Sequence, residues 1–399
     1  MSAGTTLVRD KTPVNSIVAA FRNNISQYSM LIALVGIMGF FQIMTGGILM
    51  QPVNLTNLVL QNSYIVIMAI GMLLVIVAGH IDLSVGSIAA FVGAVAAVMM
   101  VEYNVNFILV IAISIVLGAV IGGAQGYWVA YQRIPSFIVT LAGMLVFRGL
   151  TLAMLQGRSL GPFATGFQKL SSGFLPDLFA NQSLHLTSIV IGVIVSAVVV
   201  YLDWRGRQNQ VKYGFSVSPL GLFVVKNVLI TSVVIYISYL MASYKGLPNV
   251  LVVLFVLIVA YAFFTNQTTF GRRIYALGGN LKAAALSGIN TTRLTFLTFV
   301  NMGMLAALGG LIIAARLNVA TPKAGTGIEL DVIAAAFIGG ASATGGIGTV
   351  IGAVIGALVM GVMNNGMSIL GIGIDWQQAI KGLVLLAAVW FDVRSRVKS

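Results

Sequence analysis

Long apolar runs constrain this 399-residue chain more than any other feature of its sequence. Many are close to 20 residues long, which is the length an α-helix needs to cross the hydrocarbon core of a bilayer. Only 8% of the residues are charged, whereas soluble domains carry about 25%. The chain therefore cannot cover a globule with polar surface. We predict an all-α, polytopic membrane protein, because the runs are too long for the ten-residue strands of a membrane β-barrel.

Basic residues outnumber acidic ones, 22 to 9, which gives the chain a net charge of +13. The basic residues fall between the apolar runs, where positive charge sets membrane orientation, so the charge does not indicate nucleic-acid binding. The sequence has no cysteine, which excludes disulfides and thiolate metal sites. His80 and His185 are far apart, which argues against a zinc site, and we expect no bound metal or cofactor. The first long run begins near Tyr28 and does not look like a cleavable signal peptide.

The apolar runs predict about twelve transmembrane helices in one domain, residues 28–391, between cytoplasmic tails at 1–27 and 392–399. The expected spans are 28–50, 60–78, 85–101, 107–130, 137–155, 184–202, 222–243, 247–264, 294–315, 330–343, 348–362 and 376–391. With the N-terminus inside, the basic loops 203–214 and 270–293 also lie inside, as the positive-inside rule requires. Residues 330–343 are few enough to form a re-entrant segment. Residues 85–101 follow the second span so closely that the two could form one broken unit.

Glycines recur every four residues in two of the predicted spans. One set is Gly118, Gly122 and Gly126, and the other is Gly348, Gly352 and Gly356. Small residues at this spacing form a ridge that lets two helix backbones approach closely in lipid. The pattern predicts that these two spans pack tightly against neighbouring helices.

The longest polar break among the later spans is FGRRIYALGGNLKAAALSGINTTR, residues 270–293. It carries four basic residues and no acid, at Arg272, Arg273, Lys282 and Arg293. Asn280 suits an N-cap and Gly288 a C′ position, and LKAAALS between them makes about two helical turns. We predict a short capped helix on the inner face, whose small side chains suit docking into a groove on another protein. The alternative is an ordinary cytoplasmic loop that contains an incidental helix.

Two further motifs place polar residues at or within the spans. In GHIDLSVGS, Asp82 and Ser84 can cap the helix that begins near Val85, and a capped break could line a path for a polar solute. The alternative is a cap without a ligand role. In MLVFRGLT, Arg148 lies past the middle of its span, where an unpaired arginine costs at least about 2.5–3.5 kcal/mol. It either faces the interior and pairs with an acid, or it snorkels outward.

The last third of the chain holds a second group of polar candidates. In GTGIELDVIAAAFIGGAS, Glu329 and Asp331 fall in the first turn of a helix, where acids complement the macrodipole. Gating, or docking of an external partner, is the functional alternative to this capping role. Asn364 and Asn365 are amides that could hydrogen-bond sugar hydroxyls, with Gln377 and Gln378 following. Amides in membrane helices also bond neighbouring helices, so both readings stay open.

The sequence contains no G-x-x-x-x-G-K-[ST] motif and no nucleophile with a neighbouring base. We therefore expect no ATPase site and no enzyme activity, so uphill transport would need a partner or an ion gradient. An ion-coupled carrier requires ionisable groups on its path. The four acids that could serve lie at predicted span ends: Asp82, Glu329, Asp331 and Asp375.

Several of these motifs together resemble one family. ALGGN followed by AAALSGIN, GHIDLSVGS, FRG followed by GRSLGP, and GTGIELDVIAAAFIGGAS with GGIGTVIGAVIGALVMGVMNNG resemble permease subunits of bacterial ABC importers of the ribose, xylose and galactose type. The blocks run in order from Leu55 to Phe391, and His80 departs from the family's G-G-I-D-L-S-V-G-S. Residues 203–245 add a basic loop and a hydrophobic span to the ten-span plan of the ribose type. This helical pair resembles the xylose or multiple-sugar branch.

The resemblance implies a function for the whole assembly. Two permease copies, expected to be identical, would import a monosaccharide such as xylose, galactose or glucose across the bacterial inner membrane by alternating access. A periplasmic binding protein would deliver the sugar, and a separate subunit would bind ATP and Mg²⁺. That subunit would meet the coupling loop at Arg272, Arg273, Gly278, Gly279, Asn280, Ala283, Ala284, Ser287 and Gly288.

The candidates for the translocation pathway are Asp82, Ser84, Arg148, Asn364 and Asn365, with Glu329 and Asp331 as gating or helix-capping residues. The main alternative is an ion-coupled secondary sugar transporter, for which Asp82, Glu329 or Asp331 would have to be essential and titratable. A passive channel is the second alternative, and it would equilibrate sugar without accumulating it.

Overall fold

The computed structural model describes residues 25–397 except 180–183, 216 and 218. In that part of the chain the regular elements are all helices, and the only β contacts are two isolated bridges, Leu160–Ala320 and Phe174–Pro248. Nine helices in the same part have the length and composition to cross a membrane. They are α3 (Pro52–Val77), α4 with η2 (Val85–Glu102), α5 (Phe107–Ala130), α6 (Ser136–Leu155), α8 (Leu186–Lys212), α9 (Leu220–Ala242), α10 (Asn249–Gln267), α13 (Thr291–Leu317) and α15 (Val350–Ile369).

Three more helices complete the bundle: α2 (Ile25–Met44), α14 (Ile328–Ile338) and α16 (Ile374–Val397). The polytopic helical fold is thereby confirmed. The exact count of twelve spans and the cytoplasmic position of both termini stay predictions.

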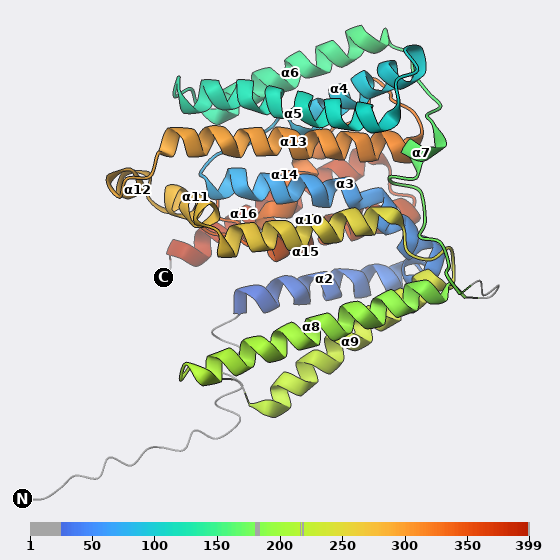
Figure 1. Cartoon of the computed structure of the whole chain (residues 1–399), viewed down its shortest axis with the longest axis vertical. Helices are drawn as coiled ribbons and strands as arrows, with labels where there is room; N and C mark the ends of the chain where they lie inside the picture. Colours follow the sequence, from blue (N-terminus) through green and yellow to red (C-terminus); the bar gives the residue numbers. More distant parts are fainter. Residues whose placement is uncertain (1–24, 180–183, 216, 218, 398–399) are drawn as a thin grey trace, which may run out of the picture.

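The long helices run roughly side by side, so the bundle has two ends (Figure 1). At one end lie α11 (Thr269–Gly279) and α12 (Leu281–Leu286), together with the C-terminal end of α16. At the opposite end lies the short helix α7 (Thr165–Gln168). Helices α8 and α9 form a pair on one side of the bundle, remote from α4, α5 and α6. The end that carries α11 and α12 is the one that the charge pattern predicts to be cytoplasmic.

Helices α3 and α13 form the centre of the bundle. In the membrane-length window of α3, 78% of the residues are buried, and in that of α13, 67% are buried. The corresponding share is only 11% for α9 and 17% for α8, so these two helices turn most of their surface outward. The bundle therefore has a protein-lined interior around α3 and α13 and a peripheral α8–α9 pair.

Glycine ridges hold the central helices together, as the four-residue spacing predicts. Gly118 and Gly122 of α5 lie directly against Gly303 of α13, and a Cβ on Gly303 would overlap the carbonyl oxygen of Gly118. A Cβ on Gly352 of α15 would likewise overlap the carbonyl oxygen of Gly339, just after α14. These contacts are possible only without side chains, which is the physical reason for glycine at these positions.

Three segments differ from the sequence-based expectation. Residues 203–214 are not a loop, because α8 continues as a helix through Lys212. Helix α3 begins at Pro52 and not at residue 60, consistent with the preference of proline for the first helical turn. In place of a span over 330–343 there is the eleven-residue helix α14, which begins at Ile328 and ends at Ile338 and at about 1.5 Å per residue spans roughly half of a bilayer core.

Candidate functional site

The predicted capped helix of the polar break is present. Asn280 accepts a hydrogen bond from the backbone N–H of Ala283 at 3.0 Å, which starts α12, and Gly288 has a φ of +80° after the helix ends. The residues just before it also form a helix, α11, whose N-cap Thr268 accepts from the N–H of Gly271 at 3.1 Å. The break is therefore two consecutive short helices at the end of the bundle.

These two helices present a basic and apolar outer surface. The side chains of Arg272, Arg273, Lys282 and Arg293 are exposed. Leu286 is 90% exposed and Leu281 is 56% exposed, although both lie outside the membrane-length helices. Single exposed leucines are common, but two on a six-residue helix that lies beside exposed cations make a compact apolar and basic patch. We call Arg272, Arg273, Leu281, Lys282 and Leu286 the coupling surface.

Two residues predicted to contact a partner face inward. Ala284 is only 5% exposed, so it packs against its own chain and cannot form part of a docking surface. Gly278 lies against the end of α3, where a Cβ would overlap the carbonyl oxygen of Val77. The same oxygen accepts a hydrogen bond from the N–H of Gly346 at 2.8 Å. Gly278 therefore seats α11 on the bundle, and the more exposed Gly279, Asn280, Ala283, Ser287 and Gly288 remain on the outer side.

The break between α3 and α4 is fastened by hydrogen bonds. Asp82 is 1% exposed, and its Oδ1 accepts from the N–H of Ser84 at 2.8 Å and from its hydroxyl at 2.6 Å. Gln125 of α5 donates to the Ser84 hydroxyl oxygen at 2.9 Å. The expected cap is wrong in detail, because Ser84 occupies the N-cap position without a side-chain bond into α4. The hydrogen bond between Ser84 and Gln125 joins α4 to α5. The sequence-based prediction did not include Gln125.

Burial dominates the electrostatics of this motif. It raises the pKa of the Asp82 carboxyl from 3.8 to about 6, and the two hydrogen bonds from Ser84 offset only part of that rise. The described residues supply no ion pair to Asp82. Desolvation without a neighbouring cation therefore favours the protonated form of this carboxyl.

Arg148 is held by a hydrogen bond and forms no ion pair in the described part of the chain, although its charge acts on Glu329. Its Nη1 donates to the Thr326 hydroxyl at 2.6 Å, which joins α6 to the segment before α14. Its side chain is half-buried, and no ion pair within 4.0 Å forms to Glu329 among the described residues. One oxygen of Glu329, Oε2, is buried without a hydrogen-bond partner in that part of the chain, close to Gly86 of α4.

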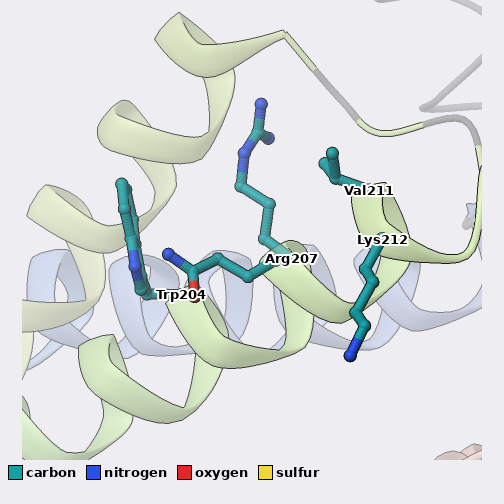
Figure 2. Close-up of a pocket in the computed structure, with 5 residues that line it drawn as sticks. Trp204, Arg207, Val211 and Lys212 are labelled. Atoms are coloured by element: carbon teal, nitrogen blue, oxygen red, sulfur yellow. The ribbon is translucent and has the colours of Figure 1, made fainter.

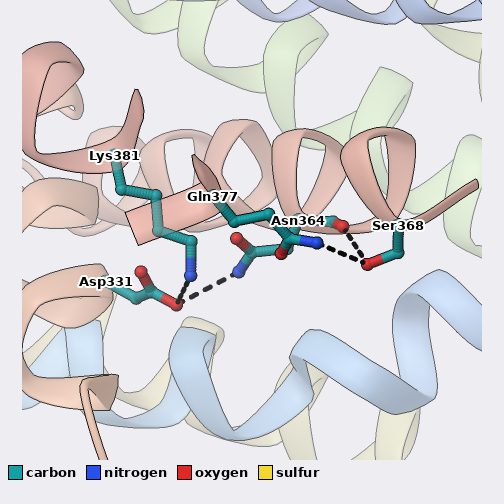
Figure 3. Close-up of polar contacts among 5 residues, drawn as sticks. All are labelled: Asp331, Asn364, Ser368, Gln377 and Lys381. Atoms are coloured by element: carbon teal, nitrogen blue, oxygen red, sulfur yellow. Dashed lines mark hydrogen bonds and ion pairs between the residues drawn. The ribbon is translucent and has the colours of Figure 1, made fainter. Parts of the chain in front are cut away.

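A polar network joins three helices inside the bundle (Figure 3). Asp331 of α14 accepts at Oδ2 from Lys381 of α16 at 3.0 Å and from Asn364 of α15 at 3.1 Å. The Ser368 hydroxyl donates to the backbone carbonyl oxygen of Asn364 at 2.8 Å, and the Gln377 side-chain amide donates to the same hydroxyl at 3.4 Å. Residue 364 therefore contacts Asp331 through its side chain and Ser368 through its backbone.

This network changes the roles expected of its members. Asp331 does fall in the first turn of α14, but Gly327 holds the N-cap position and the carboxylate is engaged by Lys381 and Asn364. The sequence-based prediction did not include Lys381. A lysine inside an apolar run is nevertheless a recognisable sign of a functional position, because placing its charge in lipid costs free energy. The network brings a carboxylate, an ammonium and two amides together, which is a set that can bind hydroxyl groups.

Asn365 does something different from its neighbour. It exchanges two hydrogen bonds with Asn54 of α3, at 2.9 and 3.1 Å, and is only 5% exposed. Both amides are used to join α15 to α3, which favours the helix-packing interpretation over a sugar contact.

Comparison with known proteins identifies the class to which this helical bundle belongs. Residues 54–389 match the model of a family described as a permease component of the branched-chain amino acid transport system. The chain belongs to this permease family and is a multi-pass protein of the inner membrane.

The more specific relatives are sugar permeases. The chain is 39% identical to the xylose transport system permease protein XylH of Escherichia coli (strain K12), over 94% of either chain. It is 40% identical to the protein of the same name from Haemophilus influenzae, and 37% identical to the ribose import permease protein RbsC of Escherichia coli (strain K12), the latter over 85% of either chain. No solved structure matches. The chain is therefore a permease component of an ABC importer of the xylose and ribose type, a class that works with ATP-binding and sugar-binding partners.

Proposed function

We propose that this permease imports a pentose, with xylose as the first candidate, and that two identical copies form the pathway. The support is the 39–40% identity to xylose permeases along nearly the whole chain, including the α8–α9 pair that exceeds the expected ribose-type plan. ATP and Mg²⁺ bind to the separate subunit in this proposal. The permease itself binds no cofactor and catalyses no reaction.

The coupling surface is the proposed contact with the ATP-binding subunit. It lies at one end of the bundle (Figure 1), carries exposed cations, and includes Leu286, which is 90% exposed. A leucine that is 90% exposed outside the membrane becomes stabilised when a partner groove covers it. Because Gly278 seats α11 against Val77, a displacement of α11–α12 by the closing ATPase displaces the inner end of α3 as well.

The Asp331 network is the proposed sugar station on the pathway. Asp331 Oδ1 and Asn364 Oδ1 are buried acceptors without a hydrogen-bond partner in the described part of the chain. Sugar hydroxyls are donors, so a pentose satisfies both atoms, and Lys381 holds the carboxylate in place through its contact with Oδ2. Specificity resides mainly in the binding protein, since this station offers few contacts.

The coupling proposal is tested by Leu286→Asp and by Arg272→Glu with Arg273→Glu. We expect loss of co-purification with the ATP-binding subunit and loss of ATP-dependent sugar uptake. Leu178→Asp is the matched control, because Leu178 is 79% exposed at the opposite end of the bundle. Unchanged co-purification of Leu286→Asp and the double arginine variant would remove the proposed role of the coupling surface.

The import proposal is tested in proteoliposomes that contain the permease, with and without its ATP-binding and sugar-binding partners, and each preparation is assayed in the presence and in the absence of an ionophore. Accumulation of xylose only with partners and ATP is the expected result. Accumulation by the permease alone, driven by an ion gradient, would establish the secondary-transporter alternative and direct attention to Asp82 and Glu329.

A further inference from the structure

One face of α8 lines two adjoining hollows on the outside of the bundle. The first lies between α8 and α9 and measures about 480 Å³. It is lined mainly by small and apolar residues, among them Ser196, Ala197, Val200 and Trp204 of α8 and Thr231 and Ile235 of α9. Its shape results from the small side chains of Ser196 and Ala197, which leave space where a larger residue would fill the contact between the two helices.

The second hollow follows directly along the same helix and has the opposite character. It measures about 250 Å³ and is lined by Trp204, Arg207, Gln208, Val211 and Lys212 (Figure 2). These positions continue the three- and four-residue spacing of the first hollow, so they lie on one face of α8. Trp204 borders both hollows, and the two form one elongated site with an apolar part and a basic part.

The position of Trp204 along α8 matches the boundary of the bilayer core. It lies 18 residues after Leu186, which corresponds to about 27 Å of helix, close to the hydrocarbon thickness of about 30 Å. Tryptophan prefers this interface. The apolar hollow therefore lies at the depth of acyl chains, and the basic hollow lies one to two turns further, at the depth of lipid headgroups.

The charges around the basic hollow favour an anion. Arg207 is held with its guanidinium carbon 5.2 Å from the centre of the Phe223 ring of α9, which orders its cation beside the hollow. The nearby acid, Asp203, is engaged by Lys226 at 2.7 Å and by Asn227 at 2.8 Å. Arg207 also acts electrostatically on Asp203, and the three cations Arg207, Lys212 and Lys226 against this one acid give the hollow a net positive potential.

We propose that this elongated site binds an anionic phospholipid of the inner leaflet. One acyl chain lies between α8 and α9, and the phosphate lies in the basic hollow, which Arg207 and Lys212 border from opposite sides (Figure 2). A soluble anion fits only the basic part of the site. A second polypeptide bound here would not need the surface of the site to change from apolar to basic at the depth of the membrane interface. The order of an apolar groove, a tryptophan and then two cations is the order of a phospholipid's own parts. The lipid holds the peripheral α8–α9 pair in a fixed geometry.

Lipid binding is measured on the purified full-length permease by native mass spectrometry, with phosphatidylglycerol and phosphatidylcholine compared at equal concentration. We expect preferential retention of phosphatidylglycerol. Arg207→Gln with Lys212→Gln reduces its apparent affinity by about fivefold per cation removed. Arg205→Gln is the matched control, because Arg205 lies on the same turn of α8 but lines neither hollow, and it leaves the affinity unchanged.

The apolar part is tested separately by Ala197→Phe, which fills the groove between α8 and α9 and should displace the lipid while both cations remain. Val198→Phe is its control, since Val198 is 48% exposed and lies outside the lining. Glycerol phosphate, which carries the headgroup charge without acyl chains, should neither bind detectably nor raise the unfolding temperature.

Three results would overturn the proposal. Equal retention of the two lipids, or an equal loss with Arg205→Gln, would show a general attraction of charge with no defined site. Full phosphatidylglycerol binding by Ala197→Phe, together with loss of the permease pair, would show that a second copy fills the groove. Each variant is first compared with the parent by thermal unfolding in neutral detergent. If the variant of the basic part is unfolded, the variant of the apolar part still tests the proposal, and the reverse also holds.

Discussion

Replacing Lys381 by methionine should destabilise the bundle, because it leaves the Asp331 carboxylate without its cation. The two side chains are 3.0 Å apart, and that of Asp331 is only 7% exposed. Removing one partner of a buried ion pair costs about 3–5 kcal/mol. Lys381 is 20% exposed and Asn364 still donates to the carboxylate, so we expect the lower end, about 3 kcal/mol. Methionine retains most of the apolar stem and therefore isolates the effect of the charge.

The double variant Asp331→Asn with Lys381→Met should recover most of the lost stability, since both charges are then absent. Thermal unfolding of the purified permease measures stability, and ATP-driven xylose uptake in proteoliposomes measures function. A purely structural pair predicts recovery of both quantities, whereas a sugar station predicts recovery of stability alone. Lys226→Met is the control, because its pair with Asp203 is 43% and 32% exposed and contributes only about 0–1 kcal/mol. A loss with Lys381→Met no larger than this control would refute the reasoning.

Three other substitutions test the remaining contacts. Asp82→Asn retains the acceptor for Ser84 and should flatten the pH dependence of stability. Because the pKa of Asp82 is raised in the folded protein, the free energy of unfolding of the parent falls as pH rises from about 4 to about 6, and the loss is roughly 3 kcal/mol at neutral pH. Unfolding measured at pH 5 and at pH 8 would reveal this loss. Gly303→Val should force α13 from α5 at a cost of at least about 1–3 kcal/mol and lower the yield of folded protein in membranes. Asn365→Leu should cost about 1–3 kcal/mol by leaving the Asn54 amide unpaired, and adding Asn54→Leu should restore thermal stability if packing is its only role.

Much of the fold follows from local sequence because lipid imposes a simple rule on it. Each membrane-crossing segment must satisfy its own backbone, so long apolar runs become helices with predictable centres. The N-cap of α12 was predictable for the same reason, since Asn280 bonds three residues away. The helix boundaries were less predictable, and α8 extends ten residues past the apolar run because 203–212 contains no proline and only one glycine, Gly206.

The candidate site was less predictable, because its contacts join residues far apart in the chain. Asn364 and Asn365 are adjacent and identical in type, yet one bonds Asp331 and the other Asn54. Only the placement of α15 between α14 and α3 distinguishes them. Gln125 and Lys381 escaped notice for the same reason, since their partners are 41 and 50 residues distant.

In the proposed coupling mechanism, the contact of Gly278 and Gly346 with Val77 determines how completely a displacement of α11 reaches the rest of the bundle. Three backbones meet there without an intervening side chain, so there is no rotamer that can relax to absorb a small displacement. A shift of α11 must therefore appear at nearly full amplitude in α3 and in the turn between α14 and α15. The three backbones are therefore expected to move together. A larger residue at either glycine should weaken the coupling of ATP turnover to sugar transport before it abolishes either activity.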